Sequence, residues 1–405
     1  MMPDLTNTKS DGYLINNRVT LVTGGKDYFE HILQLINRAQ DTLHLQTYIF
    51  KDDKTGRMVA EAIIHAAQRG VKVFLMLDGY ASQGLHRDFI NELRRVGVNF
   101  KFFEPLFRSR QFYLGRRLHH KVCVVDLRFA LVGGINIADH YNDLPHKPSW
   151  LDFALSVEGE IVSELFILCQ KTWNGFKPLK RIPKIETAPT FNFPKGDISL
   201  VRMRRNDWVR WKDEISLSYM ELFQGAKSQI TILSSYFLPG RVFRKAIRNA
   251  RKRGVEITVI VAGISDVKIA KMAERFMYEW LLSNGIKIYE YNRTVLHGKL
   301  AICDDEWITL GSFNVNDIST YASVELNLDV KKPEFARELR RHLEQNVINH
   351  STLITDSYRA NRTNALKRLL QWSAFATIRT LIYFFTFYFK RIVRTEVKKT
   401  DQYNI

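Results

Sequence analysis

The chain has little cysteine, few acidic residues relative to basic ones, and no apolar run near its N-terminus. Its three cysteines, Cys123, Cys169 and Cys303, are an odd number and none belongs to a CxxC pair. This argues against a disulfide framework or a structural zinc site and fits a reducing compartment. Residues 1–17 are polar, so we predict neither a signal peptide nor an N-terminal membrane span.

Basic residues are abundant in the chain. Its 405 residues suffice for two ordinary domains, and the hydrophobic fraction of 45% excludes general disorder. Lysine and arginine number 60 against 42 acidic residues, which gives a net charge of +18. This excess indicates an anionic partner, which could be nucleic acid, acidic lipid or a phosphorylated substrate.

The same order of predicted elements occurs twice along the chain. In each copy an alternating strand is followed by a helix that stops at a glycine and then by a continuous apolar strand. These elements are 42–50, a helix ending at Gly70 and 71–77 in the first copy, and 230–238, a helix ending at Gly254 and 255–261 in the second. We therefore predict an α/β fold with two similar lobes, each with a mixed, largely parallel sheet flanked by helices.

A proline-containing segment separates the two copies. Three prolines lie within residues 181–196, as is typical of a linker. The predicted organisation is a first lobe at 1–180, a linker at 181–197, a second lobe at 198–350 and a basic, aromatic tail at 351–405.

Each copy ends with the same polar motif. The first contains His119-x-Lys121-x4-Asp126, followed by Gly133-Gly134-x-Asn136, and the second contains His297-x-Lys299-x4-Asp304, followed by Gly311-Ser312-x-Asn314. Two such motifs at equivalent places in a duplicated chain are a strong signal. The candidate catalytic residues are therefore His119, Lys121, Asp126, His297, Lys299 and Asp304.

The motif spacing assigns different tasks to these side chains. Residues two apart on a strand share a face, so each motif histidine and lysine point the same way, whereas Asp126 and Asp304 face the opposite side and are expected to brace the scaffold. His120 lies outside the motif spacing. The paired glycines permit close backbone approach, and Asn136 and Asn314 are expected to bind an oxygen anion.

Two histidines, two lysines and two asparagines meeting in one pocket suit phosphodiester chemistry. One neutral imidazole attacks phosphorus while the other, protonated, gives a proton to the leaving oxygen. The lysines and asparagines stabilise the negative charge, the task that a divalent cation performs in metal-dependent enzymes. The sequence shows no carboxylate cluster typical of a metal site, so we expect no metal and no other cofactor.

Each histidine also needs a partner for its second ring nitrogen. Glu325 lies on the predicted strand that follows His297, and Asp152 occupies the comparable place after His119. Both acids have apolar neighbours, and we predict that they orient the histidines.

These motifs resemble the phospholipase D superfamily over roughly residues 21–347. Within it, the chain is similar to bacterial cardiolipin synthases of the short type, on the stretches 45–50, 77–80, 236–240, 296–299 and 324–327. The resemblance implies transfer of a phosphatidyl group between two phosphatidylglycerol molecules through a phosphohistidine, with release of glycerol. It further implies that His119 is the nucleophile, that His297 is the general acid, and that the hydroxyl of Ser312 contacts the phosphate.

The C-terminal segment 369–389 is rich in aromatic residues and is flanked by cations. Arg379 near its middle disfavours insertion by about 2.5–3.5 kcal/mol, so a helix lying in the membrane interface is favoured over one that spans the membrane or packs on the protein.

The sequence thus predicts a phosphatidyltransferase acting on anionic phospholipid, peripheral to the cytoplasmic side of the cell membrane. No nucleic-acid partner is expected. A phospholipase D-type lipid hydrolase or another phosphatidyltransferase is the first alternative, and a nuclease of the superfamily or a non-catalytic membrane-binding protein is less favoured.

Overall fold

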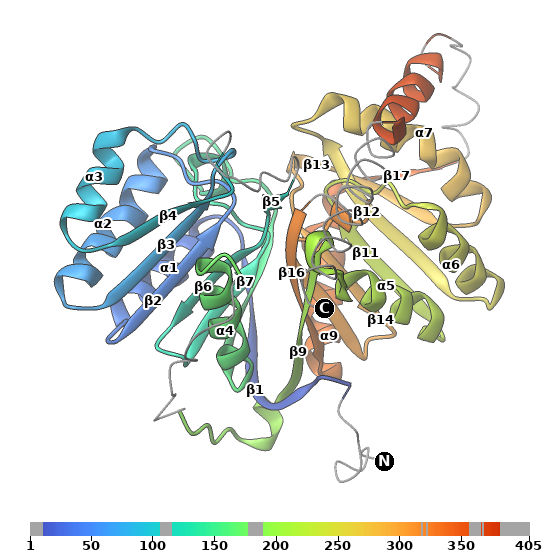
Figure 1. The fold of residues 1–405 in the computed structure, drawn as a ribbon. Coiled ribbons are helices and arrows are strands. Elements are labelled where there is room, and N and C mark those ends of the chain that lie inside the picture. The colour runs from blue at the N-terminus through green and yellow to red at the C-terminus, as the bar shows by residue number, and fades with distance from the viewer. Residues whose placement is uncertain are drawn as a thin grey trace, which may run out of the picture.

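The computed structural model describes residues 11–105, 116–176, 189–316, 319–320, 323–355, 366 and 368–380. Within these, the chain forms two similar α/β lobes (Figure 1). The first lobe contains β1 (Leu14–Thr23), α1 (Lys26–Arg38), β2 (Thr42–Thr47), α2 (Lys54–Gln68), β3 (Lys72–Asp78), α3 (Arg87–Arg95), β4 (Asn99–Phe103), β5 (Arg117–Leu118), β6 (Lys121–Val125), β7 (Phe129–Gly133), the 3₁₀ turn η1 (Asp139–Tyr141), β8 (Phe153–Gly159) and α4 (Ile161–Trp173).

The second lobe repeats this order. It contains β9 (Ser199–Asp207), the 3₁₀ turn η3 (Trp208–Arg210), β10 (Lys212–Asp213), α5 (Glu214–Gly225), β11 (Gln229–Ser234), α6 (Arg241–Lys252), β12 (Glu256–Ile264), α7 (Lys268–Ser283), β13 (Lys287–Val295), β14 (Lys299–Cys303), β15 (Trp307–Gly311), β16 (Ser323–Lys331), α9 (Pro333–Asn346) and β17 (Ser351–Ile354). Because β17 pairs with β13, the sheet of this lobe continues past residue 350.

The strand pairing is the same in both lobes. The first sheet runs β4–β3–β2–β6–β7–β8–β1, with β2, β3 and β4 parallel and the other strands antiparallel. The second runs β13–β12–β11–β14–β15–β16–β9 with parallel β11, β12 and β13. Strands β1 and β9 pair antiparallel and connect the two sheets. The mixed sheets and the repeat confirm the predicted fold class.

Two of the predicted helix stops have the expected backbone. Gly70 and Gly254, which follow α2 and α6, have φ angles of 94° and 89°, a region in which a residue with a Cβ is strained. These turns return the chain to the sheet, and the apolar strands β3 and β12 follow at once.

The two sheets face each other across an apolar core. In Figure 1, α1–α3 lie outside one sheet and α5–α7 outside the other, with the motif strands between them. All five residues of β6 and all five of β14 are buried. One core cluster combines Val122 and Val132 of the first lobe with Leu300 and Leu310 of the second. Burial on both faces explains why these strands are continuously apolar.

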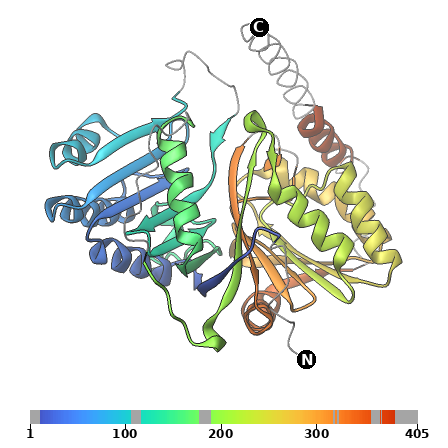
Figure 2. The same ribbon diagram turned by 60° about the horizontal axis from the view of Figure 1, so that its bottom comes forward.

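The start of the C-terminal segment is helical and lies against α7 (Figure 1, Figure 2). The rings of Phe375 and Phe276 are 5.0 Å apart, and Arg368 pairs with Glu279 at 3.5 Å. The side chains of Leu369 and Trp372 are exposed. None of the described helices is long and apolar enough to cross a membrane. The predicted interfacial helix is therefore described only to residue 380; its remainder, like residues 181–188 of the predicted linker, lies outside the described residues.

Candidate active site

Each motif begins where its strand contacts the other lobe. The backbone N–H of His119 donates to the carbonyl of Val324 at 3.0 Å, and that of His297 donates to the carbonyl of Leu151 at 2.7 Å. The neighbouring pairs are equivalent, because Leu118 pairs with Val324 in the same way that Leu296 bridges to Leu151. The two histidines thus lie at one interface, related by the symmetry of the repeat.

The histidines pair with carboxylates across this interface. His119 Nδ1 lies 2.9 and 2.8 Å from the two oxygens of Glu325, and His297 Nδ1 lies 2.7 Å from Asp152 Oδ2. Glu325 and Asp152 are fully buried. Such short contacts with a carboxylate need a proton between nitrogen and oxygen, so each Nδ1–H donates and each Nε2 holds the reactive lone pair. Both predicted orienting residues contact a histidine, and each acts on that of the opposite lobe.

Each carboxylate is held in turn by its own surroundings. The hydroxyls of Ser312 and Ser323 donate to the two oxygens of Glu325, the latter at 2.8 Å. The backbone N–H of Phe153 donates to Asp152 at 2.8 Å. The hydroxyl of Ser312, which the resemblance assigned to the phosphate, is thus engaged by Glu325.

In the first lobe Gly134 stands at the position that Ser312 occupies in the second, and the reason is steric. A Cβ at Gly134 would lie 2.4 Å from Asp152 Oδ1. The shorter aspartate side chain brings its carboxylate close to the backbone at Gly134, so only glycine fits beside it.

The lysines add positive charge in a buried setting. Lys121 Nζ donates to the carbonyl of His119 at 2.6 Å, and Lys299 Nζ donates to that of His297. Burial and, after it, the nearby charge of Lys299 lower the pKa of Lys121 to about 7. Burial lowers the pKa of Lys299 to about 8, against the opposing effect of Asp152. Two ammonium groups in a low dielectric attract an anion strongly.

Both imidazoles are neutral in the free protein near neutral pH. Burial and the charge of Lys299 outweigh the opposing effect of Asp152 and lower the pKa of His297 to about 4. Burial also lowers the pKa of His119, whereas the carboxylate of Glu325 raises it. A bound phosphodiester brings a negative charge, which favours the protonated form of the neighbouring histidine.

The two motif asparagines differ in the structure. Asn136 Nδ2 donates to the hydroxyl of Tyr141 at 2.8 Å, and its Oδ1 accepts from the N–H of Ile49 at 3.1 Å. Asn136 is therefore engaged within the protein. Asn314 Oδ1 is buried and has no hydrogen-bond partner among the described residues.

Two tyrosines at the site were missed from the sequence. The hydroxyl of Tyr141 lies 3.4 Å from His297 Nε2, and the ring of Tyr48 lies edge-on to that of His119 at 5.0 Å between centroids. Ser319 stands at the position of Tyr141 in the second copy. For Tyr141, this difference between the two copies was a signal that the sequence offered.

The motif aspartates hold backbone turns away from the histidines. Asp126 accepts the N–H groups of residues 40, 41 and 42 at 2.8, 2.9 and 2.8 Å. Asp304 accepts those of residues 227, 228 and 229 at 2.7, 2.8 and 2.8 Å. Both carboxylates thus fix the entry to the first parallel strand of a lobe, which is the bracing position expected from the strand alternation.

No group of three or more histidine, cysteine or acidic side chains in the described part of the chain is placed to hold a metal ion.

Comparisons with known proteins match this duplicated site. The sequence profile of the family "Cardiolipin synthase, PLD-like domain" matches residues 32–146 and 219–347, one region in each lobe. The chain is 33% identical to cardiolipin synthase B of Salmonella typhi over 355 residues, covering 87% of this chain and 86% of the relative. It is 32% identical to cardiolipin synthase B of Escherichia coli (strain K12) over 331 residues, covering 81% and 79%.

A solved structure shares the fold. Phosphatidylserine synthase of Haemophilus influenzae Rd KW20 superposes with a TM-score of 0.70 at 15% identity, covering 91% of this chain and 95% of that one. With the profile matched in both lobes and relatives aligned over most of their length, the chain belongs to the phospholipase D-like family of cardiolipin synthases.

Proposed function

We propose that the protein is a phosphatidyltransferase that makes cardiolipin from two phosphatidylglycerol molecules and releases glycerol. The observation that carries this proposal is the crossed pairing of His119 with Glu325 and of His297 with Asp152. It leaves two Nε2 atoms at one interface, as a two-step displacement at phosphorus requires. The family and its relatives supply the lipid substrate class.

In the first step, His119 Nε2 attacks the phosphorus of one phosphatidylglycerol. A P–N bond forms, the P–O bond to the glycerol headgroup breaks, and protonated His297 gives its Nε2 proton to the leaving oxygen. Glu325 stabilises the positive charge on the ring of His119. The product of this step is a phosphatidyl-histidine and free glycerol.

In the second step, a hydroxyl group of another phosphatidylglycerol replaces the histidine. His297 Nε2 takes the hydroxyl proton, the oxygen attacks phosphorus, and the P–N bond breaks to give cardiolipin. His297 is again protonated and His119 again neutral, so both are ready for the next cycle. Lys121, Lys299 and Asn314 stabilise the charge on the non-bridging phosphate oxygens in both steps.

The direct test is incubation with phosphatidylglycerol vesicles followed by mass analysis of the lipids. We expect cardiolipin and glycerol in equal amounts. Phosphatidic acid as the sole lipid product would identify a hydrolase, and an unchanged lipid pool would refute catalysis on this substrate. His119→Ala and His297→Ala should each abolish turnover while the circular dichroism spectrum stays that of the folded protein.

The C-terminal helix is proposed to hold the enzyme at the cytoplasmic surface of the membrane as a peripheral protein. It packs on α7 through Phe375, while Leu369 and Trp372 are 57% and 53% exposed and can enter the interface. Deleting residues 369–405 should weaken co-sedimentation of the protein with anionic vesicles. Co-sedimentation with neutral vesicles should be low both before and after the deletion. Unchanged binding to anionic vesicles would contradict this role.

A further inference from the structure

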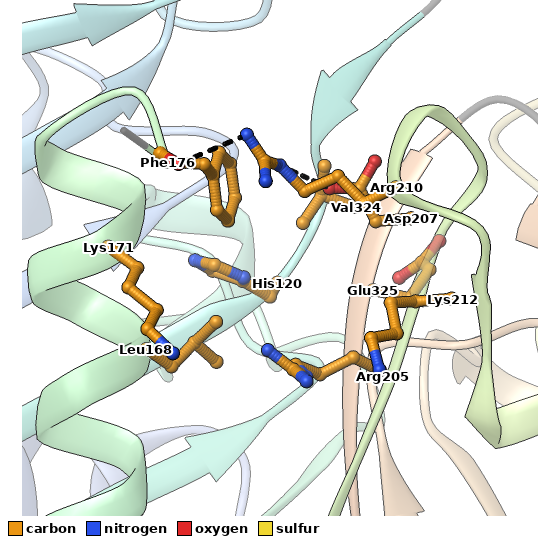
Figure 3. A pocket seen from close by; sticks show the side chains of 10 residues that line it. All are labelled: His120, Leu168, Lys171, Phe176, Arg205, Asp207, Arg210, Lys212, Val324 and Glu325. Atoms are coloured by element: carbon orange, nitrogen blue, oxygen red, sulfur yellow. Dashed lines mark hydrogen bonds and ion pairs between the residues drawn. The ribbon is translucent and has the colours of Figure 1, made fainter. Parts of the chain in front are cut away.

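A polar cavity lies on the other face of the strand that carries His119. Successive side chains on a strand point to opposite faces, so His120 points away from the active site, toward α4. There it lines a cavity of about 430 Å³ between α4 of the first lobe and β9–β10 of the second. Figure 3 shows the side chains of His120, Lys171 and Arg205 converging on this space.

The hydrogen bonds of His120 determine what its free nitrogen can do. Gln46 Nε2 donates to the carbonyl of Cys169 at 2.9 Å, which fixes the orientation of the amide. Gln46 Oε1 must therefore accept from His120 Nε2, at 2.8 Å. Burial lowers the pKa of His120 to about 3, so the ring is neutral and carries its single proton on Nε2.

His120 Nδ1 is consequently a bare acceptor. It is buried and has no hydrogen-bond partner among the described residues, and the residue is 0% exposed. A buried acceptor without a partner is unfavourable, and only a donor can satisfy it. A hydroxyl group meets this need, whereas an unprotonated anion does not.

The rest of the lining favours negative charge. Four lining residues are cations, Lys171, Arg205, Arg210 and Lys212, and two are carboxylates, Asp207 and Glu325. Glu325 is already paired with His119. Asp207 is already bound by Arg116, at 3.1 and 2.7 Å. Glu214, beside the cavity, pairs with Arg205 and Lys212, at 3.4 and 3.1 Å. Lys171 lies on the opposite wall and adds a further cation to the lining.

We propose that this cavity binds a phosphate that also carries a hydroxyl group, of the glycerol phosphate class. The phosphate lies between Arg205 and Lys171, and the hydroxyl donates to His120 Nδ1. The same unit occurs in free glycerol phosphate and in the headgroup of phosphatidylglycerol. The cavity lies on the opposite face of the strand from His119 and adjoins the active site through Glu325. Its proposed contacts, Arg205, Lys171 and His120, are not the motif residues, so the test does not depend on turnover.

Hydrogen–deuterium exchange of the full chain localises such binding. The C-terminal half of α4 and the segment from β9 to β10 line the cavity and do not carry the motif histidines. We expect protection of these two segments by millimolar glycerol phosphate and weaker protection by sulfate, which lacks a hydroxyl group. Short-chain phosphatidylglycerol micelles, with phosphatidylcholine micelles as the control, show whether the headgroup of a lipid enters. Protection by either form of the unit supports the proposal, and protection by neither overturns it.

Three variants test the assigned contacts. Arg205→Gln and Lys171→Gln should each weaken glycerol phosphate binding about tenfold, because each removes a charged donor. His120→Gln keeps a donor at the position of Nε2 and removes the acceptor at Nδ1. This variant should weaken the binding of glycerol phosphate about fivefold and leave the binding of sulfate unchanged.

Lys287→Gln is the matched control, since Lys287 pairs with Glu256 on the protein surface, outside the cavity. It should bind glycerol phosphate as the parent chain does. Lys171 is exposed on α4, so we expect Lys171→Gln to fold even if variants of the more buried residues do not. Equal protection in Lys171→Gln and in the parent would refute the site.

Discussion

Replacing Glu325 by glutamine should change the titration of His119, a residue of the other lobe, and leave that of His297 in place. Glutamine has the volume of glutamate and can still accept the Nδ1 proton, so the substitution removes charge and preserves geometry. Because the Glu325 carboxylate raises the pKa of His119, its loss should lower that pKa further.

The contact geometry sets the magnitude of this effect. Both oxygens of Glu325 lie within 2.9 Å of His119 Nδ1, and the carboxylate is 0% exposed. A carboxylate this close to an imidazolium changes the pKa by about 1–3 units, which corresponds to about 1.4–4 kcal/mol. Without the carboxylate, the positive charge that forms on the ring of His119 is no longer stabilised, so turnover should fall about 100-fold or more.

Nuclear magnetic resonance of the full chain labelled with ¹⁵N-histidine measures the effect directly. The chain has 11 histidines, and spectra of His119→Gln and His297→Gln identify the two of interest. Asp152→Asn is the matched control and should lower the pKa of His297 alone. A shift of His297 in Glu325→Gln, with His119 unmoved, would refute the crossed pairing.

Four further outcomes are expected. Gly134→Ser should reduce turnover about 100-fold, because the new Cβ would displace Asp152; wild-type kinetics would show that the turn adapts. Asp126→Ala should lower the free energy of unfolding by about 1–3 kcal/mol through the lost backbone contacts, yet the folded fraction should keep its turnover, which urea denaturation and lipid assays check together. Inorganic phosphate should bind with proton uptake at pH 8, since the anion raises the pKa of Lys121 from about 7; binding should weaken above pH 7, and calorimetry in buffers of different ionisation enthalpy measures the uptake. EDTA should leave turnover intact, so activity that is lost and then restored by a divalent ion would contradict the metal-free chemistry.

Local patterning was sufficient for the architecture. The glycine stops at Gly70 and Gly254, the apolar runs that follow them and the paired motifs predicted two equivalent lobes, because these signals depend on residues near in sequence. Strand alternation also separated the histidines and lysines from Asp126 and Asp304, since the two faces of a strand follow from a period of two.

The partners across the lobe interface could not be read from the sequence. Glu325 contacts a histidine 206 residues away, and Asp152 contacts one 145 residues away. In the sequence, each acid simply follows the histidine of its own lobe. The contacts of Ser312 with Glu325 and of Asn136 with Tyr141 lie within one lobe, and they depend on how neighbouring segments of that lobe fold together.

The sequence by itself thus predicted which residue types would carry the chemistry, and it determined on which strand face they lie and that they occur twice. Only the tertiary structure decided which acid contacts which histidine, and that His120 faces a polar cavity. The physical reason is that strand period and helix stops are properties of a few consecutive residues, whereas these contacts require the two sheets to pack face to face. Their partners are set by the pairing of β5 with β16 and by the bridge between Leu296 and Leu151.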